Sequence, residues 1–171
     1  MTEPEQQKST DQMLNEKIFP AIILVLSIVA FILFFVTDFG GWYIYDYYAY
    51  YQHIYRYVHM FSEMVWWSFV WMLPLACTFA FTGFLALMTM FKPDSKWGKQ
   101  FNLLFLVSAG SATLTLFAAI IFMLTVLDVT EWWFDAAFYG GLVGGVLNAV
   151  FAYMILRGRG EPIKFTLKLQ Q

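Results

Sequence analysis

Residues 18–36 read IFPAIILVLSIVAFILFFV, a run of nineteen residues without one charged side chain. A helix rises 1.5 Å per residue and needs about 20 apolar residues to cross the hydrocarbon core of a bilayer. Because no water is present at that depth, a spanning segment must satisfy its backbone N–H and C=O groups within the segment itself, as a helix does. The stretch therefore predicts a membrane-spanning helix.

Three later runs also lack charged side chains and are long enough to span, namely residues 64–91, 101–127 and 136–156. The whole chain is 60% hydrophobic and 13% charged, whereas soluble domains carry about 25% charged residues. We therefore predict an all-α membrane protein, in which a four-transmembrane-helix bundle occupies residues 18–156. Residues 1–17 form a polar N-terminal segment and residues 157–171 form a C-terminal tail.

The basic residues are distributed unevenly about these spans. Nine of the ten fall on one side, and Arg56 is the exception. Basic residues favour the cytoplasmic side of a membrane protein, so we expect both termini to be cytoplasmic in a multi-pass membrane protein. The small net charge of -2 gives no indication of a nucleic-acid partner. The nine basic residues are Lys8, Lys17, Lys92, Lys96, Lys99, Arg157, Arg159, Lys164 and Lys168.

The outer segment, residues 37–63, contains eight of the ten tyrosines. Two periodicities compete there. Tyr43, Tyr45 and Tyr47 alternate as in a strand, but from Ile44 onward a helical period explains more of the pattern. We therefore expect an amphipathic helix lying at the outer membrane interface and leading into the second span. Its apolar face would carry Ile44, Tyr48, Tyr51, Tyr55 and Val58.

Three interpretations of this segment remain open. It caps the bundle and anchors it among lipid headgroups, or Tyr48, Tyr51 and Tyr55 form a docking surface for a partner, since tyrosine is a favoured interface residue. Alternatively, it holds a metal or catalytic site. His59 and Glu63 have the i,i+4 spacing that would let both meet one ion. The weak metal candidates on this side are His53, His59, Glu63 and Glu131.

Small residues follow one face of the fourth span, where Gly141 and Gly145 are four positions apart and Gly144 lies between them. Small faces let helix backbones approach closely, so we expect this face to pack against the third span or against a second protein. Asn148 needs a polar partner across the bundle or in another subunit, or contacts a ligand. The small residues expected opposite, on the third span, are Ser111 and Ala112.

The layout resembles that of claudin-like proteins, which share inside termini, a larger first outer loop and a shorter second one. The first loop of that family carries a Trp and a pair of Cys, whereas residues 37–63 contain no Cys. The layout is also similar to that of the small membrane subunits of binding-protein-dependent organic-acid transporters, with Arg56-Tyr57-Val58 as the matching segment. The acidic residues that follow differ from that family's pattern. Neither resemblance transfers a residue role.

The leading hypothesis for function is a non-catalytic accessory or structural subunit of a larger integral membrane complex. Its expected contacts are membrane lipids and other membrane protein subunits, or a second copy of this chain, with no cofactor. The rival hypotheses are a small-molecule transporter or channel component and a metal-dependent membrane enzyme. Phosphate loops, nucleophile elbows and zinc motifs are missing from the sequence.

Overall fold

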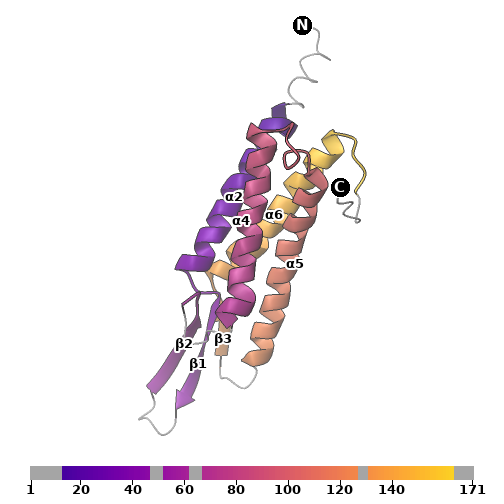
Figure 1. Ribbon diagram of the computed structural model, residues 1–171. Helices are drawn as coiled ribbons and strands as arrows, with labels where there is room; N and C mark the ends of the chain where they lie inside the picture. The colour runs from indigo at the N-terminus through magenta and orange to yellow at the C-terminus, as the bar shows by residue number, and fades with distance from the viewer. Residues whose placement is uncertain (1–12, 47–51, 62–66, 127–130, 164–171) are drawn as a thin grey trace.

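The computed structural model of the protein describes residues 13–46, 52–61, 67–126 and 131–163. Within these ranges, four helices are long and apolar enough to cross a membrane. They lie side by side in an elongated bundle with a small sheet at one end, the sheet end (Figure 1). The predicted four-helix membrane bundle is confirmed. The helices are α2 (Phe19–Val36), α4 (Leu73–Phe91), α5 (Phe101–Thr125) and α6 (Ala136–Gly158).

The spans differ from their predicted bounds mainly at the ends. Single π-helical turns, η1 (Leu14–Ile18) and η2 (Ser68–Met72), directly precede α2 and α4. Pro20 and Pro74 each stand within the first two positions of the helix that follows. A proline has no N–H to donate and its ring crowds the preceding turn, and in both helices that preceding turn is the π-helical one.

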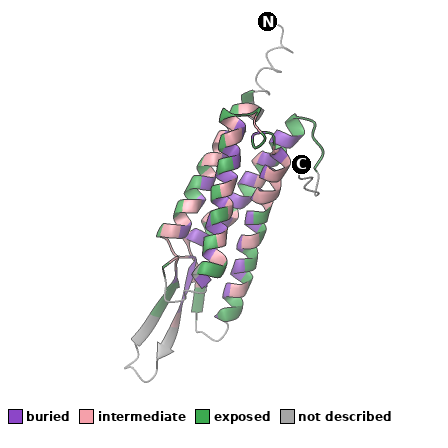
Figure 2. Ribbon diagram, viewed as in Figure 1, coloured by how far each residue is buried: buried purple, intermediate pink, exposed green. Residues whose placement is uncertain are grey.

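Each helix contacts two neighbours, and together they close a ring. α6 packs against α5 and α2, and α4 packs against α2 and α5. Buried, intermediate and exposed residues alternate along each helix (Figure 2), as expected when one side of a helix packs inside the ring and the other faces outward. Because the exposed residues of the helices are mostly apolar, the outside of the bundle suits hydrocarbon rather than water.

The sheet joins the two loops at the sheet end. Strands β1 (Gly40–Asp46) and β2 (Gln52–Val58) form an antiparallel pair before α4, and β3 (Glu131–Phe134) precedes α6. The strand order is β2-β1-β3, and both pairings are antiparallel. Gly40 pairs with Val58 on one side and with Phe134 on the other, which makes β1 the central strand.

The amphipathic helix predicted from Ile44 onward is wrong over the described residues of that segment, because β1 and β2 lie there instead. The fold is therefore mostly helical with a small sheet, rather than all-α. Aromatic side chains favour strands, and the alternation of Tyr43 with Tyr45 was the correct signal. The helical period from Ile44 onward explained more of the pattern, but it took no account of the pairing of residues 44–46 with residues 52–54 in the sheet.

Phe39 fastens the sheet to the bundle. Its side chain is fully buried, and its ring lies 5.8 to 6.3 Å from those of Phe122, Phe134, Phe138 and Trp67. Its backbone N–H donates to the carbonyl of Val58, and its carbonyl accepts from Asp135 N–H. Edge-to-face aromatic contacts add to the burial of apolar area. Phe39 therefore holds β2, and the residue that follows β3, against the ends of the helices.

The opposite end of the bundle has its own core, in which Leu85, Leu104 and Ile155 are fully or almost fully buried. The guanidinium of Arg159 lies 4.0 Å from the centre of the Phe101 ring, a cation–π contact at the point where α6 ends. The charged side chains of α6 therefore lie only in its last turn, and further charged residues follow it.

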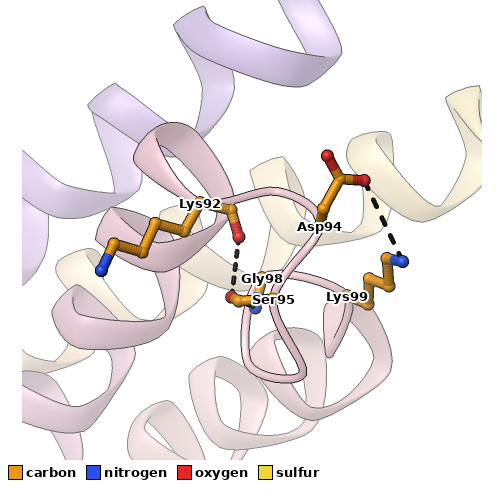
Figure 3. Close-up of polar contacts among 5 residues, drawn as sticks. All are labelled: Lys92, Asp94, Ser95, Gly98 and Lys99. Carbon is orange, nitrogen blue, oxygen red and sulfur yellow. Dashed lines mark hydrogen bonds and ion pairs between the residues drawn. The ribbon is translucent and has the colours of Figure 1, made fainter.

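The turn between α4 and α5 is held by its own polar groups (Figure 3). The Ser95 hydroxyl donates to the Lys92 carbonyl at 2.7 Å and accepts from the Gly98 N–H at 2.9 Å. Lys99 and Asp94 form an exposed ion pair at 4.0 Å. A side chain at Gly98 would collide with the carbonyls of Lys92 and Met88. The turn is therefore tight enough to make α4 and α5 an antiparallel hairpin.

Buried polar side chains inside the bundle bond locally. The hydroxyls of Thr82, Ser108 and Thr115 donate to carbonyls one turn earlier, at 2.7 to 2.8 Å. Asn148 is different, because its amide Nδ2 crosses the bundle from α6 and donates to the Ser27 hydroxyl of α2 at 3.0 Å. Both residues are buried. The predicted partner of Asn148 is thus a helix of the same chain.

The small residues of α6 lie against two neighbouring helices. A Cβ atom added to Gly145 would stand 2.7 Å from the backbone nitrogen of Ala112 on α5, and one added to Gly141 would stand 3.1 Å from Thr115 Oγ1. Gly144 faces α2, where an added Cβ would lie 3.3 Å from that of Ala30. Ser111 is fully buried on α5. In this chain, the small face of α6 is therefore covered by α5 and α2.

We expect Gly145→Ala to lower the free energy of unfolding by about 1–3 kcal/mol, because overpacking against a backbone cannot be relieved by a rotamer change. Gly110→Ala is the matched control, since nothing lies within 4 Å of a Cβ added there. Its stability should be unchanged or slightly higher. Detergent-denaturant unfolding followed by tryptophan fluorescence measures both variants. Equal losses at the two positions would contradict this account of α6 packing.

Candidate functional site

One face of the sheet gathers aromatic side chains, and we call it the aromatic sheet face. Alternate residues of a strand point to the same side. The register pairs Tyr43 with Tyr55 and with Glu131, and pairs Gly41 with Tyr57 and with Trp133. These pairs therefore share one side of the sheet. The aromatic sheet face is defined by Tyr43, Tyr55, Tyr57, Glu131 and Trp133.

Gly41 makes room for the centre of this face. A Cβ atom added there would stand 2.6 Å from the indole of Trp133 and 2.9 Å from the Arg56 carbonyl. The Trp133 ring therefore leans across the central strand. It lies 5.8 Å from the Tyr57 ring and 6.4 Å from the Tyr55 ring, both edge-to-face. A larger residue at position 41 would push the indole away from the two tyrosines.

The other face of the sheet belongs to the core. Trp42 and Val58 are buried, and the Phe134 ring stacks on that of Phe138 at 4.0 Å. The Phe122 ring, from α5, approaches those of both Trp42 and Phe134. Near the helix ends this side is closed by the bundle, whereas Arg56 and Trp132, which share it, are exposed. The aromatic sheet face is open at its two tyrosines on β2. Tyr55 is 57% exposed and Tyr57 is 45% exposed.

Glu131 sets the electrostatics of the aromatic sheet face. Partial burial and then the charge of the Glu131 carboxylate raise the pKa of Tyr43, and a hydrogen bond to that carboxylate adds to the effect. A nearby negative charge disfavours the phenolate. Tyr43 therefore holds its proton as a donor to Glu131.

Two acidic residues lie where the sheet meets the helices. Burial raises the pKa of Asp38, the nearby His59 lowers it and the nearby Asp135 raises it. The Asp135 carboxylate accepts from the N–H of Ala136 at 2.7 Å and so caps the start of α6. The Asp38 carbonyl accepts from Ala137 N–H. These contacts show that the junction is built mainly to start α6.

The metal candidates are only partly placed by the structure. His59 follows β2, and its Nδ1 accepts from the N–H of Phe61 at 3.2 Å. Glu131 interacts with Tyr43 on β1. His53 lies on β2 opposite Tyr45, and Glu63 lies outside the described residues. Within the described ranges, no three His, Cys, Asp or Glu side chains are close enough together to hold a metal ion.

The predicted docking tyrosines are also divided. Tyr55 lies on the aromatic sheet face, whereas Tyr48 and Tyr51 lie outside the described residues. Sequence reasoning missed Tyr57 and Trp133 as neighbours of Tyr55. The alternation of Tyr55 with Tyr57 could have indicated their shared face. Trp133 could be placed only once the pairing of β3 with β1 was known.

We expect Glu131→Gln to lower the pKa of Tyr43 toward the ordinary tyrosine value of 10.0, because the neighbouring negative charge is removed. In the wild-type protein, a raised pKa means that the folded chain binds this proton more tightly than the unfolded chain, so stability falls as the pH rises above that ordinary value. NMR of ring-labelled tyrosine, with Tyr43→Phe to assign the signal, measures the shift. An unchanged titration in the variant would contradict the contact.

Comparison of the chain with models of protein families, with the sequences of curated proteins and with solved structures finds no match. No relative therefore supplies roles for the residues of the aromatic sheet face. Its exposure, its charge and its position at the end of a membrane bundle are the properties that bear on its function.

Proposed function

We propose that the chain is a non-catalytic accessory or structural subunit of a larger integral membrane complex, and that it binds its partner through the aromatic sheet face. The observation that carries this proposal is the exposure of Tyr55 and Tyr57 beside Trp133, on the open side of the sheet. Tyrosine and tryptophan are enriched in interfaces because each combines a large apolar ring with a hydrogen-bonding group.

The position of the face favours contact with another protein. The sheet projects from the end of the helix bundle (Figure 1), so its open side is accessible beyond the spans. Tyr43, Tyr55, Tyr57 and Trp133 are held by pairing between three strands and by ring contacts. A preformed surface loses little conformational freedom on binding. Rigid aromatic anchors on a fixed sheet suit a stable subunit contact.

The acidic residues on this side of the spans indicate which kind of partner suits the aromatic sheet face. The sequence places Asp38, Asp46, Glu63, Asp128, Glu131 and Asp135 on this side of the spans, against one basic residue, Arg56. Complementary charge steers association and disfavours wrong partners. The partner segment proposed for the aromatic sheet face is therefore one that carries lysine or arginine, whose cations also bind well over tyrosine and tryptophan rings.

The proposal predicts a size shift that depends on the exposed tyrosines. Extracted gently from its own membrane, the wild-type chain should elute well above the size of a 19.9 kDa protomer. The Tyr55→Ser, Tyr57→Ser double variant should elute as the free chain, because interface anchors carry most of the binding free energy. Tyr139→Ser is the matched control, since Tyr139 is 55% exposed but lies on α6.

Size-exclusion chromatography with light scattering makes this comparison, and a shared thermal midpoint shows that both variants are folded. A wild-type chain that runs alone would refute the complex. A complex that survives the double variant, or that the Tyr139 control also loses, would refute the aromatic sheet face as its docking surface. A complex of identical chains would identify the partner as a second copy.

We also propose that both termini are cytoplasmic, because every basic residue that the structure describes, except Arg56, lies at the end of the bundle opposite the sheet. Cys77 is the chain's single cysteine, so Cys77→Ser gives a cysteine-free background. In intact cells, a membrane-impermeant maleimide should label Arg56→Cys, which lies on the side of β2 away from the aromatic sheet face, and spare Lys96→Cys; both positions are exposed. Labelling of Lys96→Cys before lysis would reverse the assignment.

A further inference from the structure

A groove of about 310 Å³ runs between α2 and α4 on the side of the bundle. Its floor and walls include Leu24, Ser27 and Phe31 from α2, and Phe79, Gly83 and Phe84 from α4. The volume falls within the range of small-molecule sites, about 300–1,000 Å³. The groove is separate from the aromatic sheet face.

Two small residues create the groove. A Cβ atom added to Gly83 would lie 3.3 Å from the Cβ of Ser27, so α2 and α4 approach closely at this point. Both residues are buried, whereas Phe84 on the rim is exposed and Phe31 is half-buried. Large rings standing beside a small floor leave a channel between them. The close approach of two backbones thus produces a groove that opens outward.

The groove offers its occupant almost no polar contact. Ser27 is the one lining side chain with a hydroxyl, and it is 1% exposed. That hydroxyl accepts from Asn148 Nδ2, on the inner side of α2. An occupant that needed hydrogen bonds would lose those it made elsewhere. The chemistry of the walls therefore selects a hydrocarbon.

The groove lies at a depth where lipid hydrocarbon surrounds a spanning bundle. Its α2 residues, Leu24 to Phe31, are the middle of the Phe19–Val36 helix, and its α4 residues, Phe79 to Leu87, lie well inside Leu73–Phe91. In a spanning bundle, this depth is occupied by lipid chains. A helix is about 10 Å across, and a single lipid chain is much thinner, so a chain can lie along the groove between the two helices.

We propose that the groove between α2 and α4 is a binding site for one hydrocarbon chain of a membrane lipid. Lipid chains are as apolar as the groove, so transfer between them brings no hydrophobic gain. The gain is van der Waals contact, because a chain in the groove meets protein on several sides. A lipid chain held there fills the space between α2 and α4 and so adds to the packing of these two helices.

Native mass spectrometry of the full chain, exchanged into detergent with added dioleoyl phosphatidylcholine, tests the site. The wild-type protein should retain one lipid. Gly83→Leu and, separately, Ala80→Leu should reduce that occupancy roughly tenfold or more, because the leucine takes the volume of the chain. Gly110→Leu adds the same side chain at an exposed position of α5 with nothing within 4 Å, and it should retain the lipid.

A second comparison separates chain recognition from headgroup recognition. Dioleoyl phosphatidylglycerol should compete with dioleoyl phosphatidylcholine equally, because the walls of the groove do not reach a headgroup. Preference for one headgroup would overturn the proposal, as would a wild-type chain that retains no lipid or an equal loss in Gly110→Leu. Retention of lipid by both groove variants, each shown to be folded by its thermal midpoint, would place the lipid elsewhere and overturn it too.

Discussion

At Gly145 the backbone of α6 comes so close to that of α5 that no side chain fits between them. In hydrocarbon, helices gain nothing from hiding apolar surface from each other, so close van der Waals contact must hold them together. Gly144 gives α6 a second such contact, with α2. In the ring of four helices, α6 thus joins α5 to α2. The Ser27–Asn148 hydrogen bond can span α2 and α6 because the two backbones are already close.

The sheet depends on the same arrangement. β3 leads directly into α6, so the placement of α6 beside α2 also brings β3 beside β1. Phe39 then joins the two loops and the helix ends in one aromatic cluster. The orientation of the open side of the sheet is consequently set by the same contacts that hold the bundle together. The exposed tyrosines of this sheet, unlike tyrosines on a free loop, have a spacing that is fixed before a partner binds.

The helices were predictable from the sequence because charge-free length is a local property. The four runs could be recognised residue by residue. Their observed ends differ by at most two positions, except that α4 begins at Leu73, after the turn η2, rather than at residue 64. The sheet was not predictable in this way. From Ile44 onward, a period of 3.6 explained more of the pattern than a period of 2, yet residues 44–46 pair with residues 52–54. The sheet is completed by the pairing of residues 40–43 with residues 131–134. That pairing is absent from any short window of sequence, as is the neighbourhood of Trp133 and Tyr57.

The distance along the chain between β1 and β3 also has a consequence for biogenesis. A ribosome completes β1 and β2 before it has made α4 or α5, and it makes β3 only afterwards. Until then, the β1 edge that will receive β3 presents unpaired N–H and C=O groups, which other strands can join. The β1–β2 pair therefore remains without β3 while two further helices are made and inserted. The time during which another strand could join its open edge is set by the translation and insertion of residues 59–130.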